Sequence, residues 1–244
     1  MAAVKTALVA GVGPKLGLGA ALARRFAAEG LTVIIAGRSP DKLSLVADDI
    51  NAGGGQVIAV PADATDEDGI RRIFQAATAE GMRLDIAVYN VDSNQSAPLL
   101  DTTLEHFTAL WRQNTLGAFL FAREAARSML PQGRGTVIFT GATASMRARP
   151  PFTGFAAAKA GVRAIAQGMA REFGPRGLHV AHVVIDGVID GDRARRQFSQ
   201  YVDSKGKDGL LHPDAIAESY WHLHNQHPSA WSHEIDLRPF KEPF

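Results

Sequence analysis

The chain has 244 residues and a formal net charge of +1 at pH 7, with 46% hydrophobic residues. This balanced charge gives no general argument for nucleic acid or an anionic membrane as a partner. The absence of cysteine excludes disulfides, thiolate catalysis and cysteine-ligated metal. The composition is that of an ordinary globular protein, and the length suits one large α/β domain.

The hydropathy of the chain bears on its location. No run approaches the roughly 18 apolar residues that a membrane-spanning helix requires. The apolar start, residues 7–12, is interrupted by Gly13-Pro14-Lys15 and lacks a cleavage site, so it does not have the form of a signal peptide. We therefore expect a cytoplasmic protein with no membrane and no nucleic acid among its partners.

Apolar runs of strand length alternate with longer helical patterns along the whole chain. In chain order, the first half predicts a strand at 5–10, a helix at 19–28, a strand at 32–36, a helix at 41–52, a strand at 56–60, a helix at 66–79 capped by Thr65, and a strand at 85–89. The second half predicts helices at 104–112 and 115–129, a strand at 136–140, a helix at 155–173, a strand at 179–185, a helix at 213–224 and a strand at 233–237. This alternation implies one α/β domain over residues 1–244, with a doubly wound parallel sheet of about seven strands flanked by helices.

The turn after the first strand is rich in glycine. It reads Gly11-Val12-Gly13-Pro14-Lys15-Leu16-Gly17-Leu18-Gly19. Glycines allow the backbone to approach a pyrophosphate, and the helix that follows offers unpaired N–H groups and the positive end of its dipole. A tight strand-to-helix loop is the plainer interpretation, but the strand–turn–helix context favours a dinucleotide site in a Rossmann fold.

The second strand ends in Ala36-Gly37-Arg38-Ser39 rather than in an acidic residue. An acidic side chain there would accept the ribose hydroxyls of NAD, whereas the guanidinium of Arg38 suits a 2′-phosphate. Lys15 brings a second positive charge near the same place. The alternative is a solvated arginine at the end of a strand. The pattern favours NADP(H) over NAD(H), with Arg38 and Ser39 at the phosphate.

With these residues the chain resembles the short-chain dehydrogenase/reductase family over nearly its whole length. The resemblance implies that Lys159 is the catalytic lysine and that Asn114, in Arg112-Gln113-Asn114-Thr115, is the catalytic asparagine that orders a water in the proton relay. It also implies further cofactor contacts after the third, fourth and sixth strands. These are Asp63 and Ala64, Asn90 and Val91, and Val188 and Ile189.

The chain departs from the family at the positions that carry hydroxyl groups. Phe155 stands four residues before Lys159, where the family has its catalytic tyrosine, and Ala142 falls on the catalytic serine. The family's Asn-Asn-Ala-Gly is here Tyr89-Asn90-Val91-Asp92, and its Pro-Gly after the sixth strand is Asp186-Gly187. Fold and cofactor binding carry over, but the proton-transfer mechanism does not.

Two hypotheses follow for the activity. In the first, the chain is an NADP(H)-dependent oxidoreductase for a small carbonyl, alcohol or activated alkene, with a substitute proton donor. The candidates are Asp186, which is the sharpest, then Asp92, Thr143, Ser145, or a water held by Asn114 and Lys159. Asp186 is equally well explained as a turn or capping residue. In the second hypothesis, the chain binds NADP(H) without turnover, as a sensor or an inactive partner in an assembly.

The substrate is expected between the segments after the fifth and sixth strands. Ala142, Thr143, Arg147 and Phe155 are predicted to line its pocket, and residues from about 190 to 211 correspond to the family's lid. Arg147 and Arg149, together with the lid residues Arg193, Arg195 and Arg196, suggest an anionic or acyl-carrier-linked substrate. Solvated lid charges are the alternative.

The remaining features concern metal and assembly. His222, His224 and His227 do not share one helical face, so no metal site is predicted. The family forms dimers and tetramers through the helices that correspond to 115–129 and 155–173, so a homo-oligomer is expected. The tail 238–244 carries two phenylalanines and is expected to pack, across a subunit interface for example.

Overall fold

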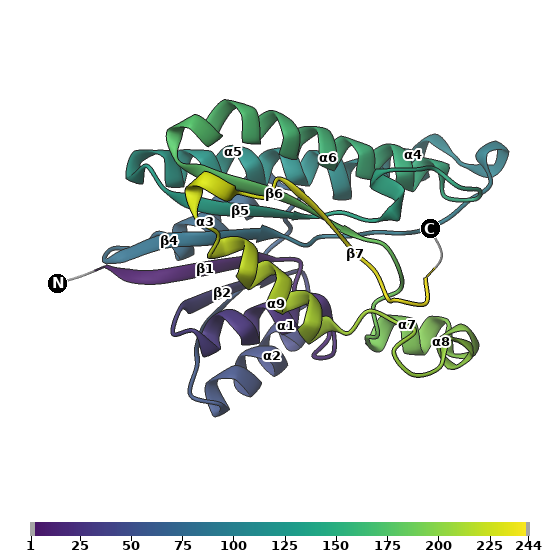
Figure 1. Cartoon of the computed structure of the whole chain (residues 1–244), viewed down its shortest axis with the longest axis horizontal. Coiled ribbons are helices and arrows are strands. Elements are labelled where there is room, and N and C mark those ends of the chain that lie inside the picture. Colours follow the sequence, from purple (N-terminus) through teal and green to yellow (C-terminus); the bar gives the residue numbers. More distant parts are fainter. Residues whose placement is uncertain (1–2, 243–244) are drawn as a thin grey trace.

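The computed structural model describes residues 3–242, in which one parallel sheet has the strand order β3-β2-β1-β4-β5-β6-β7. Helices cover both faces of this sheet (Figure 1). The strands are β1 Val4–Ala10, β2 Thr32–Gly37, β3 Gln56–Pro61, β4 Met82–Tyr89, β5 Gly135–Thr140, β6 Leu178–Ile185 and β7 Glu234–Leu237. The predicted doubly wound α/β fold is confirmed.

The helices lie in two layers. One layer contains α1 Leu18–Ala28, α2 Pro40–Ala52 and α9 Pro213–His224. The other contains α3 Glu67–Ala77, α4 Leu104–Trp111, α5 Gly117–Met129 and α6 Thr153–Phe173. Two short helices, α7 Asp192–Gln197 and α8 Ser199–Lys205, lie beyond the carboxyl ends of the strands (Figure 1).

The central strands are apolar on both faces because each face is covered by helices. Ala7 and Val9 of β1 point into the core beneath α1 and α9, whereas Leu8 and Ala10 point into the core beneath α3 and α5. All four side chains are fully buried. This alternation with a period of two fixes the register of β1, the strand that leads into the glycine-rich turn.

The structure corrects several details of the predicted elements. Asp66, rather than Thr65, caps α3, because its carboxylate accepts a hydrogen bond of 2.8 Å from Gly69 N. A π-helical turn, Arg112–Leu116, joins α4 to α5 as one continuous rod. Helices α7 and α8 were not predicted, because their sequence carries few apolar residues.

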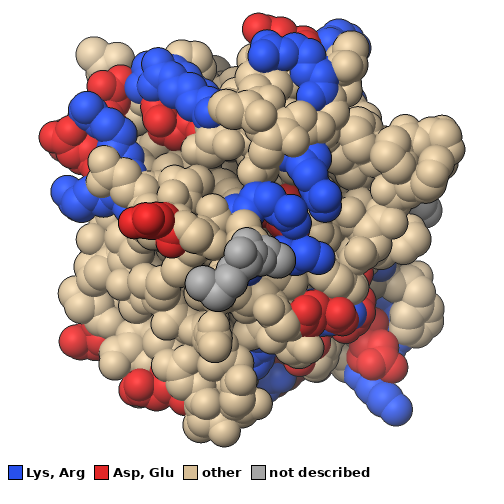
Figure 2. Space-filling model, turned by 90° about the vertical axis from the view of Figure 1, so that its left-hand side faces the viewer, with Lys and Arg blue, Asp and Glu red and all other residues tan. Residues whose placement is uncertain are grey.

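Charges of both signs are interspersed at the end of the molecule where β1 begins (Figure 2). That face therefore offers no extended single-sign surface to a nucleic acid. Within residues 3–242, no helix combines the length and apolar character that a membrane crossing requires.

Candidate active site and cofactor site

The parallel sheet brings the predicted site residues to one edge, where its strands have their carboxyl ends. Ala10 at the end of β1 pairs with Ala36 of β2 on one side and with Tyr89 of β4 on the other. The chain therefore leaves β1 and β4 toward opposite ends of the sheet, and the crevice at such a point is where α/β folds bind their ligands. The segments after β1, β2, β3, β4, β5 and β6 all start at this edge.

The glycine-rich turn is held tightly against its neighbours. Gly11 N and Val12 N both donate to Ala36 O at 2.9 Å, and Gly11 has φ +94°. A Cβ at Gly11 would lie 2.6 Å from the Asn90 backbone, and one at Gly19 would lie 2.8 Å from Gly11 O. Only glycine allows these approaches.

The same turn is open where a dinucleotide would lie. A Cβ built at Gly13 meets nothing within 4 Å. Gly17 precedes α1 without a side-chain cap, and the first turn of α1 carries no acidic residue, so its N–H groups and positive dipole end remain available to an anion. The residues present therefore fit a pyrophosphate. This arrangement includes Gly11, Gly13, Lys15, Leu16, Gly17, Leu18 and Gly19.

The predicted phosphate-binding cations have different surroundings. Arg38 is exposed just beyond β2. Lys15 is not free to bind a phosphate beside Arg38, because its ammonium pairs with Asp49 of α2 at 2.5 Å. Ser39 is the residue before α2 and makes no side-chain cap there. Arg38 is thus the guanidinium available at the end of β2.

The expected adenine and nicotinamide contacts lie on ordered loops. Asp63 accepts hydrogen bonds of 2.8 Å from both Thr65 N and Thr65 Oγ1, which leaves Ala64 buried between them. Val188 O accepts from Leu211 N at 2.9 Å, and Ile189 bridges to Leu211, so the segment after β6 is tied to the end of the lid.

Lys159 is buried at the centre of the edge, with its residue only 1% exposed. It comes from the second turn of α6, and its Nζ donates to Thr140 O at 3.1 Å. The same Nζ lies 3.1 Å from Asp92 Oδ1. The Phe155 ring, one helical turn earlier, has its centroid 5.8 Å from Nζ. Lys159 therefore meets a carboxylate and a hydrocarbon ring.

A chain of hydrogen bonds connects the partner of Lys159 to the glycine-rich turn. Thr140 Oγ1 donates to Asn90 Oδ1 at 3.0 Å, and Asn90 Nδ2 donates to Gly11 O at 3.2 Å. Tyr220 of α9 lies 2.9 Å from Thr140 Oγ1, and burial raises the pKa of its phenol. A protonated Tyr220 can donate a hydrogen bond to Thr140 Oγ1. This would orient the hydrogen bonds that run from Thr140 through Asn90 to Gly11.

Asn114 lies in the π-helical turn and is fully buried. Its Nδ2 donates to Leu110 O at 3.0 Å and to Ser93 O at 3.4 Å, so it binds the loop that carries Asp92. Within the described chain, Asn114 Oδ1 has no hydrogen-bond partner. Single π-turns occur frequently at functional sites.

Asp186, after β6, is engaged by three side chains. Thr143 Oγ1 donates to its Oδ1 at 2.5 Å, Arg147 Nη2 lies 3.3 Å from its Oδ2, and Arg238 also donates to Oδ2. The side chain is only 5% exposed. These contacts make Asp186 an acceptor at the centre of a cluster, which argues against the predicted role of proton donor.

The two hydroxyl groups that were candidates for the proton donor, those of Thr143 and Ser145, already take part in hydrogen bonds. Thr143 Oγ1 donates a hydrogen bond to Asp186, and Ser145 Oγ accepts one from Ala142 N at 3.0 Å inside the short turn after β5. Ala142 and Phe155, which the resemblance aligns with the family's two hydroxyl groups, have only carbon in their side chains, and Phe155 is 7% exposed.

The predicted cluster of arginines is largely paired with carboxylates. Arg195 binds Asp190 at 2.7 and 2.8 Å, Arg147 binds Asp186, and Arg193 Nη1 lies 3.8 Å from Asp92 Oδ2. These ion pairs favour a structural role for the three arginines over the binding of an anionic substrate.

Sequence reasoning missed three residues of this network: Thr140, Tyr220 and Arg238. A threonine that ends β5 beside a glycine was the available signal for the first. Tyr220 is 80 residues from Thr140, and Arg238 is 52 residues from Asp186, so no local pattern connects them.

Comparisons with known proteins agree with this geometry. A family model described as short chain dehydrogenase matches residues 5–201. The uncharacterized oxidoreductase YuxG of Bacillus subtilis is 32% identical over 207 residues, which are 84% of this chain but only 30% of that relative. A 3-oxoacyl-[acyl-carrier-protein] reductase of Synechocystis is 32% identical over 192 residues, with 77% of each chain covered.

A solved structure of a short-chain dehydrogenase also matches this chain. The crystal structure of a short-chain dehydrogenase from Rhodopseudomonas palustris has a TM-score of 0.82 and 37% identity, with 97% of this chain and 99% of that chain covered. The chain therefore belongs to the short-chain dehydrogenase/reductase family, oxidoreductases that bind a nicotinamide cofactor.

Proposed function

We propose that the chain is an NADP(H)-dependent oxidoreductase for a small carbonyl, alcohol or activated alkene, with a non-standard proton donor. The observation that carries this proposal is the buried Lys159, which is joined through Thr140 and Asn90 to Gly11 of the glycine-rich turn. Such a connection holds a cation and a dinucleotide cradle in a fixed relation, and positioned hydride transfer depends mostly on geometry.

The cofactor would lie along the edge of the sheet. The glycine-rich turn would hold the pyrophosphate, Arg38 and Ser39 the 2′-phosphate, Asp63 and Ala64 the adenine side, and Asn90, Val91, Lys159, Val188 and Ile189 the nicotinamide side. When bound, the nicotinamide supplies or accepts the hydride. The exposed guanidinium of Arg38 supports NADP(H) over NAD(H).

The proton transfer needs a donor other than a side-chain hydroxyl at position 155. We propose that a water near Asn114 and Lys159 serves, because Asn114 Oδ1 is a buried acceptor without a partner in residues 3–242, and Asn114 Nδ2 binds the loop whose Asp92 pairs with Nζ of Lys159. In this proposal, Ala142, Thr143, Arg147 and Phe155 shape the substrate pocket, residues from about 190 to 211 form its lid, and Asp186 anchors the pocket wall.

Turnover tests the proposal directly. Purified protein would be incubated with NADPH and a panel of ketones, aldehydes and activated alkenes, and oxidation followed by absorbance. We expect slow turnover that the Lys159→Ala variant loses, since the ammonium positions the reacting groups.

A second function is supported by the hydrocarbon at both hydroxyl positions, Phe155 and Ala142. In that case the chain binds NADP(H) without turnover, as a sensor or an inactive partner. Tight NADPH binding with no oxidation by any member of the panel would favour this alternative and contradict the enzyme proposal.

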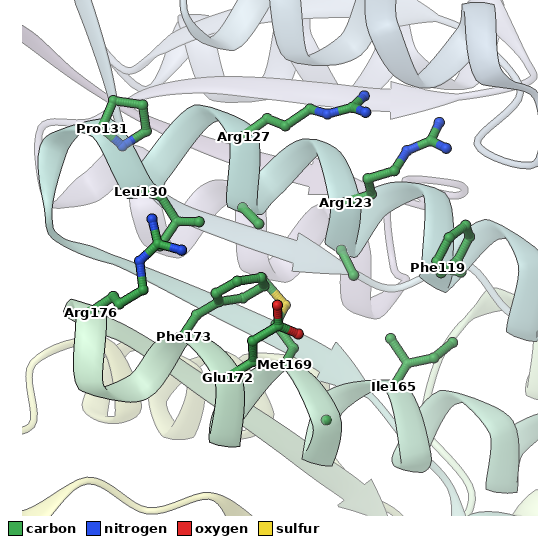
Figure 3. A pocket seen from close by; sticks show the side chains of 13 residues that line it. Phe119, Arg123, Arg127, Leu130, Pro131, Ile165, Met169, Glu172, Phe173 and Arg176 are labelled. Atoms are coloured by element: carbon green, nitrogen blue, oxygen red, sulfur yellow. The ribbon is translucent and has the colours of Figure 1, made fainter.

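We also propose that the chain assembles with itself through α5 and α6, and that it works in the cytoplasm. A hollow of about 640 Å³ lies between these helices. Figure 3 shows Leu130, Met169 and Phe173 between the two helices, Glu172 beside Met169, and Arg123 and Arg127 pointing away from α6. Phe119, Leu130, Ile165, Met169 and Phe173 are apolar lining residues, and Arg123, Arg127, Glu172 and Arg176 are charged ones. An apolar surface with a charged rim is the form of a protein interface.

A further inference from the structure

The ammonium of Lys159 requires an explanation of its own. Its side chain is 2% exposed, and a buried charge is costly unless an opposite charge and hydrogen bonds compensate it. The family's tyrosine position offers only the Phe155 ring here, 5.8 Å from Nζ. A ring face contributes far less than a carboxylate, and the Thr140 carbonyl carries no net charge.

Asp92 supplies the missing charge. Its Oδ1 lies 3.1 Å from Nζ of Lys159, and it comes from the loop after β4, where the family has glycine. The loop is held in place because Ser93 O accepts from the buried Asn114 Nδ2. The carboxylate is therefore presented to Lys159 by an ordered loop.

The same carboxylate also reaches the lid. Arg193 of α7 lies 3.8 Å from Asp92 Oδ2 and donates to Asn94 Oδ1 in the same loop. The neighbouring Asp192 accepts from Leu16 N of the glycine-rich turn at 3.4 Å. Helix α7 is thus tied to both sides of the crevice, on one side through Asp92.

We propose that Asp92 is a positioning residue that replaces the lost tyrosine hydroxyl as the polar partner of Lys159 and couples this lysine to lid helix α7. This inference rests on the proposed function in one respect, the expected change in NADPH affinity. One carboxylate serves two cations, so the removal of its charge frees the ammonium and loosens the lid together.

The primary test measures Lys159 and the lid without any cofactor. Asp92→Asn should raise the acetylation rate of Lys159, measured by mass spectrometry, by about tenfold, and should speed tryptic cleavage within residues 195–207 severalfold, in line with the loss of one partly buried ion pair. Arg193→Gln should speed lid cleavage with a smaller effect on Lys159. Asp92→Glu should restore most of both values.

Asp68→Asn is the matched control, since Asp68 is an exposed aspartate that pairs with Arg71 at 2.6 Å on α3. If Asp92→Asn and Arg193→Gln behave like this control in both assays, the inference is overturned. Arg193→Gln keeps this result interpretable even if Asp92→Asn folds poorly, because Arg193 is 46% exposed.

NADPH titration separates the inference from the proposed function. We expect Asp92→Asn to weaken NADPH binding severalfold, and to have a smaller effect in a Lys159→Met background, where only the contact with the lid is left to lose. Equal losses in both backgrounds would contradict the coupling. If the wild-type chain binds no NADPH, the proposed function fails, while acetylation and cleavage still decide the inference.

Discussion

Phe155 and Ala142 are the two side chains at which the sequence predicts the loss of a catalytic hydroxyl group. The Phe155 ring already faces Nζ of Lys159 at 5.8 Å, so Phe155→Tyr would introduce a phenol beside the ammonium. We predict that Phe155→Tyr combined with Ala142→Ser raises carbonyl reduction by about 10²–10⁴-fold, the usual contribution of general acid catalysis. Phe152→Tyr, at an exposed neighbouring ring, is the control. Unchanged turnover in a variant that binds NADPH would contradict the proposed geometry.

Arg38 is the side chain that we propose to distinguish NADP(H) from NAD(H). Because a charge-assisted hydrogen bond contributes roughly 1.5–3 kcal/mol, Arg38→Ala should weaken NADPH binding by about tenfold or more. NADH affinity should not change, since NADH lacks the 2′-phosphate. Calorimetric titration with both cofactors measures this, with Arg72→Ala on α3 as the control. An equal loss for both cofactors would assign Arg38 to stability instead.

His182 makes the stability of the fold depend on pH. Burial lowers its pKa from 6.5 to about 4, against the opposing hydrogen bond to Glu234 at 2.9 Å. Between these two values the unfolded chain binds more protons than the folded one, so the free energy of unfolding falls as pH falls from 6.5 to about 4. Urea unfolding across this range should show the slope, and His182→Asn should reduce it. An identical slope in the variant would contradict the assignment.

Among the elements, the described part of the tail, residues 238–242, contacts the lid of the same chain, while Phe244 lies outside the described residues. Lys205 of α8 pairs with Glu242 at 3.1 Å, and Lys241 Nζ donates to Lys207 O at 2.7 Å. We predict that truncation after Leu237 speeds hydrogen exchange in α8 severalfold, since short helices with few buried contacts open easily. Exchange in α9 is the internal control. Unchanged exchange in α8 would show that the tail does not hold the lid.

Local patterns predicted the elements that bury a continuous apolar face. Strands such as Thr32–Gly37 and helices such as Pro213–His224 carry their own hydrophobic period, which the structure confirms. Helices α7 and α8 lack this signal, because their order depends on contacts such as Asp192 with the glycine-rich turn. The family resemblance predicted that Lys159 and Asn114 belong to one site, but the Lys159–Asp92 pair depends on how distant segments meet.

At the scale of the whole molecule, the α5–α6 face predicts self-association. A side chain at Gly168 meets nothing within 4 Å in one chain, so Gly168→Arg should fold normally yet place a charge in the hollow. Light scattering at micromolar concentration should show a dimer or tetramer for the wild type and a shift toward monomer for this variant. Ala52→Arg, on the opposite face of the sheet, is the control. A monomeric wild type would contradict the interface.

The central claim is that a dinucleotide cradle and its buried lysine persist where the neighbouring hydroxyl groups have been replaced by carbon. Calorimetric titration of the full chain with NADPH and with NADH tests this most directly. We expect saturable binding of NADPH that is tighter than that of NADH. Absence of binding heat with either cofactor, across several temperatures, would contradict it.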